Sequence, residues 1–239
     1  MKALNHLQLT LRQYLLMMAL MSPLAVIAIP CNTGLDGAAS TCGISLLGAG
    51  SSDEHWSVAD PYPTAPTGPL IDSSLLPTLS FGSAFANRNA AWSLVNGPNS
   101  GWIKPTATLQ SLNGGQYVYH TTFTGATPFE GQYSSDNILW GVFLNNAELV
   151  DFPHNIGAEF FKWTPFSISA GLNTGLNTLD FVVRNYGGGG IDSNPTGFRA
   201  EFSAISEPSI VGLFLMGLPG FMFFGHRYTK HDKPHSVTR

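Results

Sequence analysis

Short apolar runs separated by Gly, Asn and Pro recur at close spacing between residues 51 and 205. In 116–124, Tyr117, Tyr119, Thr121 and Phe123 alternate with the residues between them, a period of two that places successive side chains on opposite faces of a strand. No stretch of this region sustains the 3.6-residue period of a helix. The pattern predicts an all-β fold, an antiparallel β-sandwich, with strands over 91–95, 116–124, 138–144, 147–152, 160–168, 178–184 and 197–204.

Turn residues and loops separate these runs. Asn113-Gly114 and Asn145-Asn146 are turn signals because both residue types accept a positive φ. The proline-dense segment 60–69 predicts a loop. The segment 51–58 predicts a polar loop that leads into a strand, with Trp56 packed inward. Asp53, Glu54 and His55 precede that tryptophan, but three consecutive side chains cannot all face one metal ion without a special turn.

The amino-terminal segment has the pattern of a secretory signal peptide. Lys2 and Arg12 precede an uncharged stretch that ends in small residues at position 28. We expect signal peptidase to remove residues 1–28, with an uncleaved anchor helix as the alternative. Pro30 precedes Cys31, where a lipoprotein requires a small residue. Residues 29–50 then form a lead-in, and residues 51–205 form the β-sandwich domain.

The carboxy-terminal segment 206–239 predicts membrane targeting. Residues 210–225 lack charge and predict an apolar helix, and the tail 226–239 is basic. At 1.5 Å per residue the helix would be about 24 Å long, shorter than the roughly 30 Å of a bilayer core. The basic tail should stay cytoplasmic, which leaves the body outside. A short, glycine-rich span suits a removable sorting signal, with an ordinary membrane helix or a buried helix as alternatives.

The residues around this helix carry a family resemblance. Ser206, Glu207 and Pro208, followed by the apolar run and Arg227, resemble the PEP-CTERM sorting signal of Gram-negative bacteria, in which Pro usually stands where this chain has Ser206. The resemblance implies recognition by an exosortase, a membrane protease or transpeptidase, and removal of the tail. It also implies transient anchoring in the inner membrane and export to the cell surface or matrix of bacteria that make exopolysaccharide.

A second resemblance covers most of the body. A set of motifs, in this order, is similar to the β-sandwich module common in PEP-CTERM proteins, which is itself similar to galactose-binding-like jelly rolls. That likeness implies about eight strands, a binding surface at the end loops or on a concave face, and often a structural calcium. The motifs are Asp53-x-His55-Trp56, Gly101-Trp-Ile-x-Pro105, Tyr117-x-Tyr-x-Thr-Thr-Phe123, Asp136-Asn137 with Leu144-Asn145, Gly175-Leu-Asn-Thr-Leu-Asp-Phe-Val-Val183 and Asn194-Pro-Thr-Gly197.

Charge and cysteine usage narrow the functional classes. Residues 29–205 hold five basic and thirteen acidic side chains, a net charge of −8, which excludes nucleic acid as a partner. Cys31 and Cys42 can pair in an oxidising compartment, where so small a loop would contribute about 3 kcal/mol. Free thiols are the alternative.

Motifs of catalysis are missing from the sequence. It has no Gly-x-Ser-x-Gly elbow and no His-Glu-x-x-His, and the glycine run 187–190 lacks the Lys-Ser/Thr of a phosphate loop. A pair of carboxylates for glycoside cleavage stays open, because thirteen acidic residues always provide one. We expect a protein that is not an enzyme and has no cofactor other than a possible structural calcium.

Five tryptophans in the body offer surfaces for sugar binding, because exposed indole faces stack on the C–H faces of sugars. Trp102, beside Gly101 and close to a turn, is the best exposed candidate, whereas Trp140 and Trp163 lie in apolar runs and are expected in the core. Asp136 and Asp192 could supply oxygen ligands to calcium, or could simply stabilise Asx turns.

These observations lead to one functional hypothesis and two alternatives. We expect an exported surface or matrix protein whose β-sandwich binds carbohydrate, with exopolysaccharide as the partner. A structural or adhesive matrix protein with protein partners is the first alternative, and a glycan-cleaving enzyme is the second.

Overall fold

The computed structural model describes residues 29–38, 42–61, 71–88, 92, 97–108, 112, 114–154, 160–186 and 194–205. The expected signal peptide over 1–28 and the expected sorting signal over 206–239 lie outside these residues, and so do the site residues Ser206, Glu207, Pro208, Arg227 and Asp192. Among the described residues no helix is long and apolar enough to cross a membrane.

The described body is a single antiparallel sheet, so the all-β prediction is confirmed. Its spatial strand order is β7, β6, β9, β4, β1, β2, β3, β10, β5, β8. The only helical element with bounds among the described residues is a 3₁₀ turn, η1 (Leu76–Thr78). The strands are β1 (Ser52–Ala59), β2 (Gly82–Asn87), β3 (Trp102–Lys104), β4 (Gly115–Thr124), β5 (Phe129–Asp136), β6 (Ile138–Leu144), β7 (Ala147–Glu148), β8 (Thr164–Ile168), β9 (Leu176–Asn185) and β10 (Gly197–Ala204).

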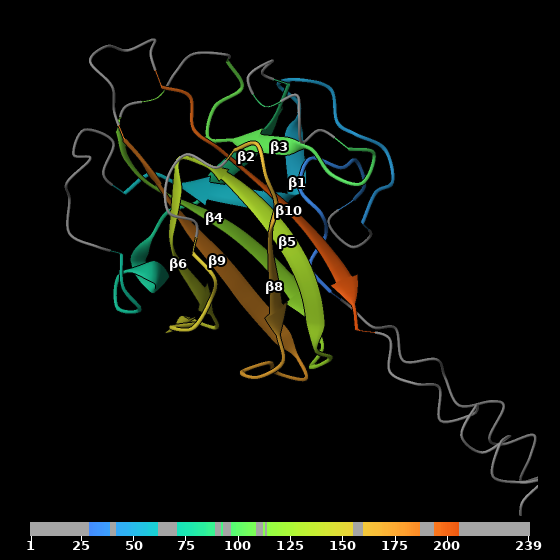
Figure 1. The fold of residues 1–239 in the computed structure, drawn as a ribbon, viewed down its shortest axis with the longest axis vertical. Coiled ribbons are helices and arrows are strands. Elements are labelled where there is room, and N and C mark those ends of the chain that lie inside the picture. Colours follow the sequence, from blue (N-terminus) through green and yellow to red (C-terminus); the bar gives the residue numbers. More distant parts are fainter. Residues whose placement is uncertain are drawn as a thin grey trace, which may run out of the picture.

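The sheet curls until its two halves face each other, an arrangement consistent with the expected β-sandwich (Figure 1). One layer contains β6, β9 and β4, the other contains β10, β5 and β8, and β1 to β3 join them. Aromatic side chains fill the space between the layers. The rings of Phe181 in β9 and Phe198 in β10 have centroids 4.7 Å apart, and Trp56 of β1 lies 5.6 Å from Phe198. Alternation along β10 then leaves Arg199, Glu201 and Ser203 on the outer face of their layer.

The strand predictions succeed where apolar residues alternate with polar ones or form a continuous run. The predicted 116–124, 138–144, 178–184 and 197–204 correspond to β4, β6, β9 and β10. Two predictions were too long, because 147–152 contains only the two residues of β7 and 160–168 becomes a strand only at Thr164. β2, β3 and β5 were missed, and the segment 51–58 is strand β1 almost throughout instead of a polar loop. Of the strand predicted over 91–95, only Trp92 is described.

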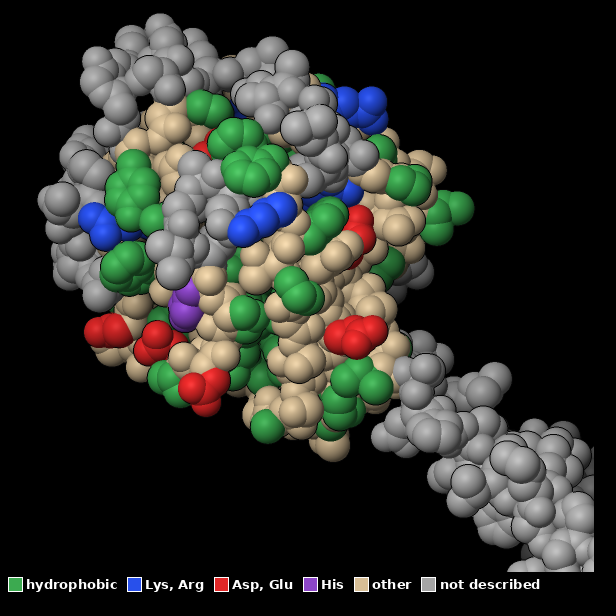
Figure 2. All heavy atoms as spheres, in the orientation of Figure 1, with side chains coloured by type: hydrophobic (Ala, Val, Ile, Leu, Met, Phe, Trp, Pro, Cys, Tyr) green, Lys and Arg blue, Asp and Glu red, His purple; other side chains and the backbone are tan. Residues whose placement is uncertain are grey.

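The outer face of the layer formed by β6, β9 and β4 is partly covered. The segment around η1 packs on β4, β6 and β9 and forms a small second core of Ala59, Ile71, Leu76, Val118, Phe143 and Val182. Figure 2 shows another face of the molecule, on which uncharged side chains predominate and charged ones are scattered. That surface agrees with a chain of which only 11% is charged.

Candidate functional site

The structure overturns the proposed role of Trp102. Its side chain is 0% exposed, and its ring stacks on that of Trp92 with centroids 4.7 Å apart. Gly197 makes room for this pair, since a Cβ at that position would lie 2.7 Å from the Trp92 ring. Trp102 therefore belongs to a small aromatic core and cannot contact a sugar.

Asp136 is an internal hydrogen-bonding residue. Its buried carboxylate accepts hydrogen bonds from Trp92 Nε1 at 2.8 Å and from Asn137 Nδ2 at 2.7 Å. Burial raises the pKa of Asp136 to about 6, against the lowering effect of the Trp92 hydrogen bond. Within the described residues no three His, Cys, Asp or Glu side chains gather to bind a metal ion.

Two more tryptophans lie elsewhere than expected. Trp140 was predicted in the core but is 37% exposed on the outer face of β6. Trp163 was also predicted in the core, but it is half-buried and its ring covers the guanidinium of Arg199, with 4.5 Å between the guanidinium carbon and the ring centroid. Both rings are therefore accessible on outer faces of the sheet.

A concavity lies against the outer face of β10 and β5, and we call it the Glu201 cavity. Its volume is about 690 Å³. Strand residues form its floor: Glu130, Gln132, Glu201 and Ser203. Loop residues form its walls: Asn32, Leu35, Gly43, Ile44, Pro98 and Asn99. Carboxylate, amide and hydroxyl groups thus converge on one space.

Glu201 is the fixed centre of the floor. One carboxylate oxygen accepts hydrogen bonds from Ser100 Oγ at 2.7 Å and Arg199 Nη2 at 3.3 Å, and the other accepts from Gln132 Nε2 at 2.9 Å. Arg199 is fully buried, and burial lowers its pKa to about 10, so that it remains a cation at neutral pH. These contacts hold the Glu201 carboxylate in one orientation, which favours recognition of a rigid ligand.

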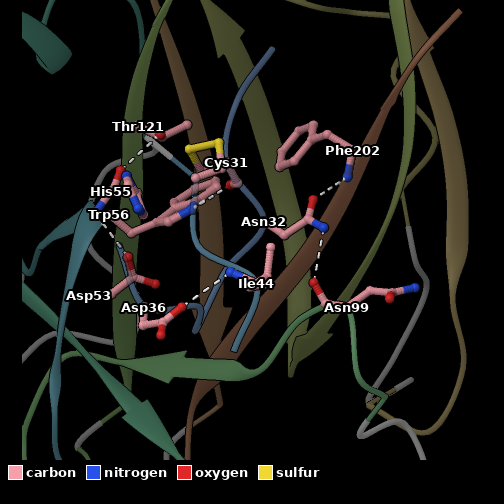
Figure 3. Close-up of a disulfide and its surroundings, with 11 residues drawn as sticks. Cys31, Asn32, Asp36, Ile44, Asp53, His55, Trp56, Asn99, Thr121 and Phe202 are labelled. Atoms are coloured by element: carbon pink, nitrogen blue, oxygen red, sulfur yellow. Dashed lines mark hydrogen bonds between the residues drawn. A yellow bond between two sulfur atoms is a disulfide. The ribbon is translucent and has the colours of Figure 1, made fainter. Parts of the chain in front are cut away.

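The wall is held by the disulfide predicted from the sequence. Cys31 and Cys42 are joined, and there are no free cysteines among the described residues. Figure 3 shows the bridge beside Trp56, whose Nε1 donates to Cys31 O at 3.0 Å. Behind it, Gly34 N donates to the buried carboxylate of Asp53 in β1 at 2.6 Å. The described residues 31–38 and 42–46, called here the disulfide loop, are therefore anchored to the body.

Asn32 connects this loop to the other wall and to the floor. Its side-chain oxygen accepts from Phe202 N at 2.7 Å, and its side-chain nitrogen donates to Asn99 O at 2.9 Å (Figure 3). Thr33 extends the contact, because Thr33 N donates to Ala200 O at 3.1 Å and Ala200 N donates to Thr33 Oγ1 at 3.0 Å. Residues 32 and 33 of the disulfide loop are thus bonded to β10 beside the cavity.

The residues of this site are not recognisable as a group in the sequence. Glu130, Gln132 and Glu201 are scattered in polar segments, and only the register of β10 against β5, in which Glu201 pairs with Gln132 and Ser203 with Glu130, brings them together. A usable signal was the alternation of Arg199, Glu201 and Ser203 with apolar residues in 197–204. That pattern places the three side chains on one outer face.

Comparison with known proteins gives a structural likeness but no sequence relative. The sequence matches no protein-family model and no curated protein. Among solved structures, the chain is similar to a family 35 carbohydrate-binding module from an environmental isolate, with 11% sequence identity and a TM-score of 0.28. The match covers 63% of this chain and 98% of that module. A likeness at this TM-score carries no argument about fold or ligand.

Proposed function

We propose that this protein is an exported, non-enzymatic carbohydrate-binding protein that holds a neutral glycan in the Glu201 cavity. The observation behind the proposal is the cavity itself, where fixed carboxylate, amide and hydroxyl groups converge beside a rigid wall. Sugars offer many hydroxyl groups, which donate to carboxylates and both donate to and accept from amides. A preorganised set of such groups binds without a large ordering cost.

The charge of the floor favours a neutral ligand. Glu130 and Glu201 lie on the outer faces of neighbouring strands, two register positions apart on the diagonal. The only cation bonded to them among the described residues is Arg199, which pairs with Glu201. These carboxylates would repel a negatively charged ligand, so uncharged hexose or pentose polymers are the expected class.

Export is the other half of the proposal. The disulfide supports an oxidising compartment. The segment 1–28 is proposed as a signal peptide, and 206–239 as a PEP-CTERM-like sorting signal that an exosortase removes. On this proposal the protein passes through the inner membrane, reaches the surface or the extracellular matrix, and meets exopolysaccharide there.

The cavity is tested by filling it. Ser203→Tyr places a ring over the floor from an exposed position of β10, and Thr122→Tyr makes the same change at an exposed position of β4 in the other layer. Isothermal titration against a panel of neutral polysaccharides should give saturable binding to at least one member. Ser203→Tyr should weaken it at least tenfold, and Thr122→Tyr should not change it.

Other outcomes would change the assignment. If no polysaccharide of the panel binds, or if the two variants bind equally well, the Glu201 cavity is not a glycan-binding site. Release of reducing ends that Glu130→Gln abolishes would assign a glycan-cleaving enzyme instead.

A second candidate function, self-association as a structural matrix protein, is favoured by an open groove between the two end strands of the sheet. The groove has a volume of about 750 Å³ and is lined by residues 148–153 beside β7 and by residues 165–170 of β8 and the turn after it. Val150 in its wall is 75% exposed. On this alternative, light scattering over a concentration series would show dimers or larger species, and Val150→Asp would dissociate them into monomers.

A further inference from the structure

A second surface stands on the outer face of the other layer. It consists of Trp140 in β6, Arg184 in β9 and Tyr186 just after β9, and we call it the Arg184 platform. The guanidinium carbon of Arg184 lies 5.2 Å from the centre of the Trp140 ring and 5.4 Å from that of the Tyr186 ring. Trp140 is 37% exposed and Tyr186 is 46% exposed. Two accessible aromatic rings therefore share one cation.

Local backbone structure explains the position of each ring. The pairing of β6 with β9 shifts between Leu139 and Gly141, and this irregularity lets Leu139 and Val142 both point into the core while Trp140 points outward. Tyr186 is held through its backbone, because its N–H donates to Asn137 Oδ1 at 2.8 Å and its carbonyl accepts from Asn194 Nδ2.

The charge of Arg184 is not paired within the described residues. Among the described residues no carboxylate lies within ion-pairing distance of its guanidinium, whereas Arg199 pairs with Glu201. The Nε atom of Arg184 is buried and has no hydrogen-bond partner among those residues. This uncompensated charge stands in a body whose net charge over residues 29–205 is −8. A guanidinium held in this way presents a planar set of donors that suits a carboxylate.

We propose that the Arg184 platform is a second binding site, specific for acidic polysaccharide. The aromatic rings stack on the C–H faces of the sugar units, and the guanidinium donates to a carboxylate of the polymer. This ligand differs from that of the Glu201 cavity, whose two carboxylates repel an acidic chain. The two sites lie on the outer faces of different layers, so one molecule holds an acidic and a neutral glycan at the same time. Only this bridging rests on the proposed function; the platform stands on its own geometry.

The test uses alginate, a carboxylated polysaccharide, and dextran, an uncharged one, in titrations of the purified protein. Arg184→Gln should lower the affinity for alginate about tenfold or more, the size of a lost charge-assisted hydrogen bond. Arg88→Gln removes an equal charge at an exposed arginine outside the platform and should leave that affinity within twofold. Tyr186→Ala, which truncates an exposed ring, should weaken alginate binding severalfold and provides a second variant if Arg184→Gln unfolds.

Several results would overturn the site. One is an alginate affinity that neither Arg184→Gln nor Tyr186→Ala changes. Another is a loss of alginate affinity in Arg88→Gln as large as that in Arg184→Gln. The third is dextran binding that Arg184→Gln weakens as much as it weakens alginate binding. Binding to vesicles of anionic lipid that disappears with Arg184→Gln would assign a membrane surface in place of the polysaccharide.

Bridging is measured separately. Beads coated with alginate should capture, through the protein, a labelled neutral polysaccharide from the panel that fits the Glu201 cavity. With Ser203→Tyr the protein should still bind the alginate beads but no longer capture the neutral polymer. With Arg184→Gln the protein should no longer bind the beads but should still bind the neutral polymer in solution. If the unmodified protein binds alginate but no neutral polysaccharide, the proposed function is contradicted and the platform stands. If it binds a neutral polysaccharide but not alginate, the platform is contradicted and the proposed function stands.

Discussion

Asp136 is a buried carboxylate whose ionisation opposes folding. Its pKa is raised from 3.8 to about 6, so the folded state retains a proton that the unfolded chain loses. The stability that Asp136 provides is therefore complete below about pH 4 and is lost as the pH rises to about 6. Two pH units correspond to roughly 3 kcal/mol.

The Asp136→Asn variant isolates this effect from that of other acidic groups. We expect the free energy of unfolding of the variant, relative to the unmodified protein, to rise by roughly 2–3 kcal/mol between pH 4 and pH 7. Urea unfolding at several pH values measures the difference. A difference that stays constant with pH would show that Asp136 ionises normally in the fold.

Single residues were the hardest to predict from the sequence. Trp102 looked exposed beside Gly101, but the small residue that decides its environment is Gly197, 95 positions away, which lets Trp92 stack on it. Trp140 looked buried because its run is apolar, but a pairing irregularity at the neighbouring Gly141 turns the ring outward. Such decisions depend on distant partners and on register, which the local pattern does not contain.

At the scale of elements, the disulfide loop forms part of the wall of the Glu201 cavity, in addition to cross-linking the segment before the domain. The double variant Cys31→Ser/Cys42→Ser should lower the free energy of unfolding by about 3 kcal/mol, because the unfolded chain gains the freedom of the opened loop. It should also weaken neutral glycan binding severalfold, because Asn32 and Ile44 lose their fixed positions. Urea unfolding and titration measure both effects, and two unchanged values would contradict this role.

The pairing of β5 with β10 under the cavity requires a glycine. A Cβ at Gly131 would lie 2.5 Å from the carbonyl oxygen of Glu201 and 2.6 Å from the ring of Phe166. Gly131→Ala should therefore cost about 1–3 kcal/mol of stability. Gly175→Ala is the matched control, since no atom lies within 4 Å of a Cβ there. Thermal unfolding compares the two variants, and an equal effect would refute the close approach.

A strand could be predicted from the sequence when its residues were apolar or β-branched in a regular pattern. β4 and β9 were predicted because apolar and β-branched residues alternate along them, whereas β5 carries the sequence FEGQYSSD, whose polar residues hide a strand. Four of its residues, Tyr133 to Asp136, are nevertheless buried, and β10 pairs with all four, whereas β8 pairs with β5 only as far as Tyr133. Tertiary pairing overrides a weak local preference there.

At the scale of the whole molecule, two unlike surfaces stand on opposite layers of one curled sheet. The Glu201 cavity carries two carboxylates and a rigid polar wall, and the Arg184 platform carries two rings around a cation that forms no ion pair within the described part of the chain. Core packing of Phe181 against Phe198 keeps the layers, and hence the two surfaces, at a fixed separation. The sequence predicted the all-β sheet, but not the strand register that assembles the Glu201 cavity or the pairing irregularity beside Trp140.

The central claim is that a neutral glycan occupies the Glu201 cavity, and nuclear magnetic resonance of the isotope-labelled protein tests it most directly. Titration with an oligosaccharide of the neutral polymer that binds best should shift the side-chain amide signals of Asn32, Asn99 and Gln132 together, with one dissociation constant. The signals of Trp140 and Arg184 should stay in place. Saturation that leaves the three amides unmoved, or that moves only the platform signals, would contradict the account.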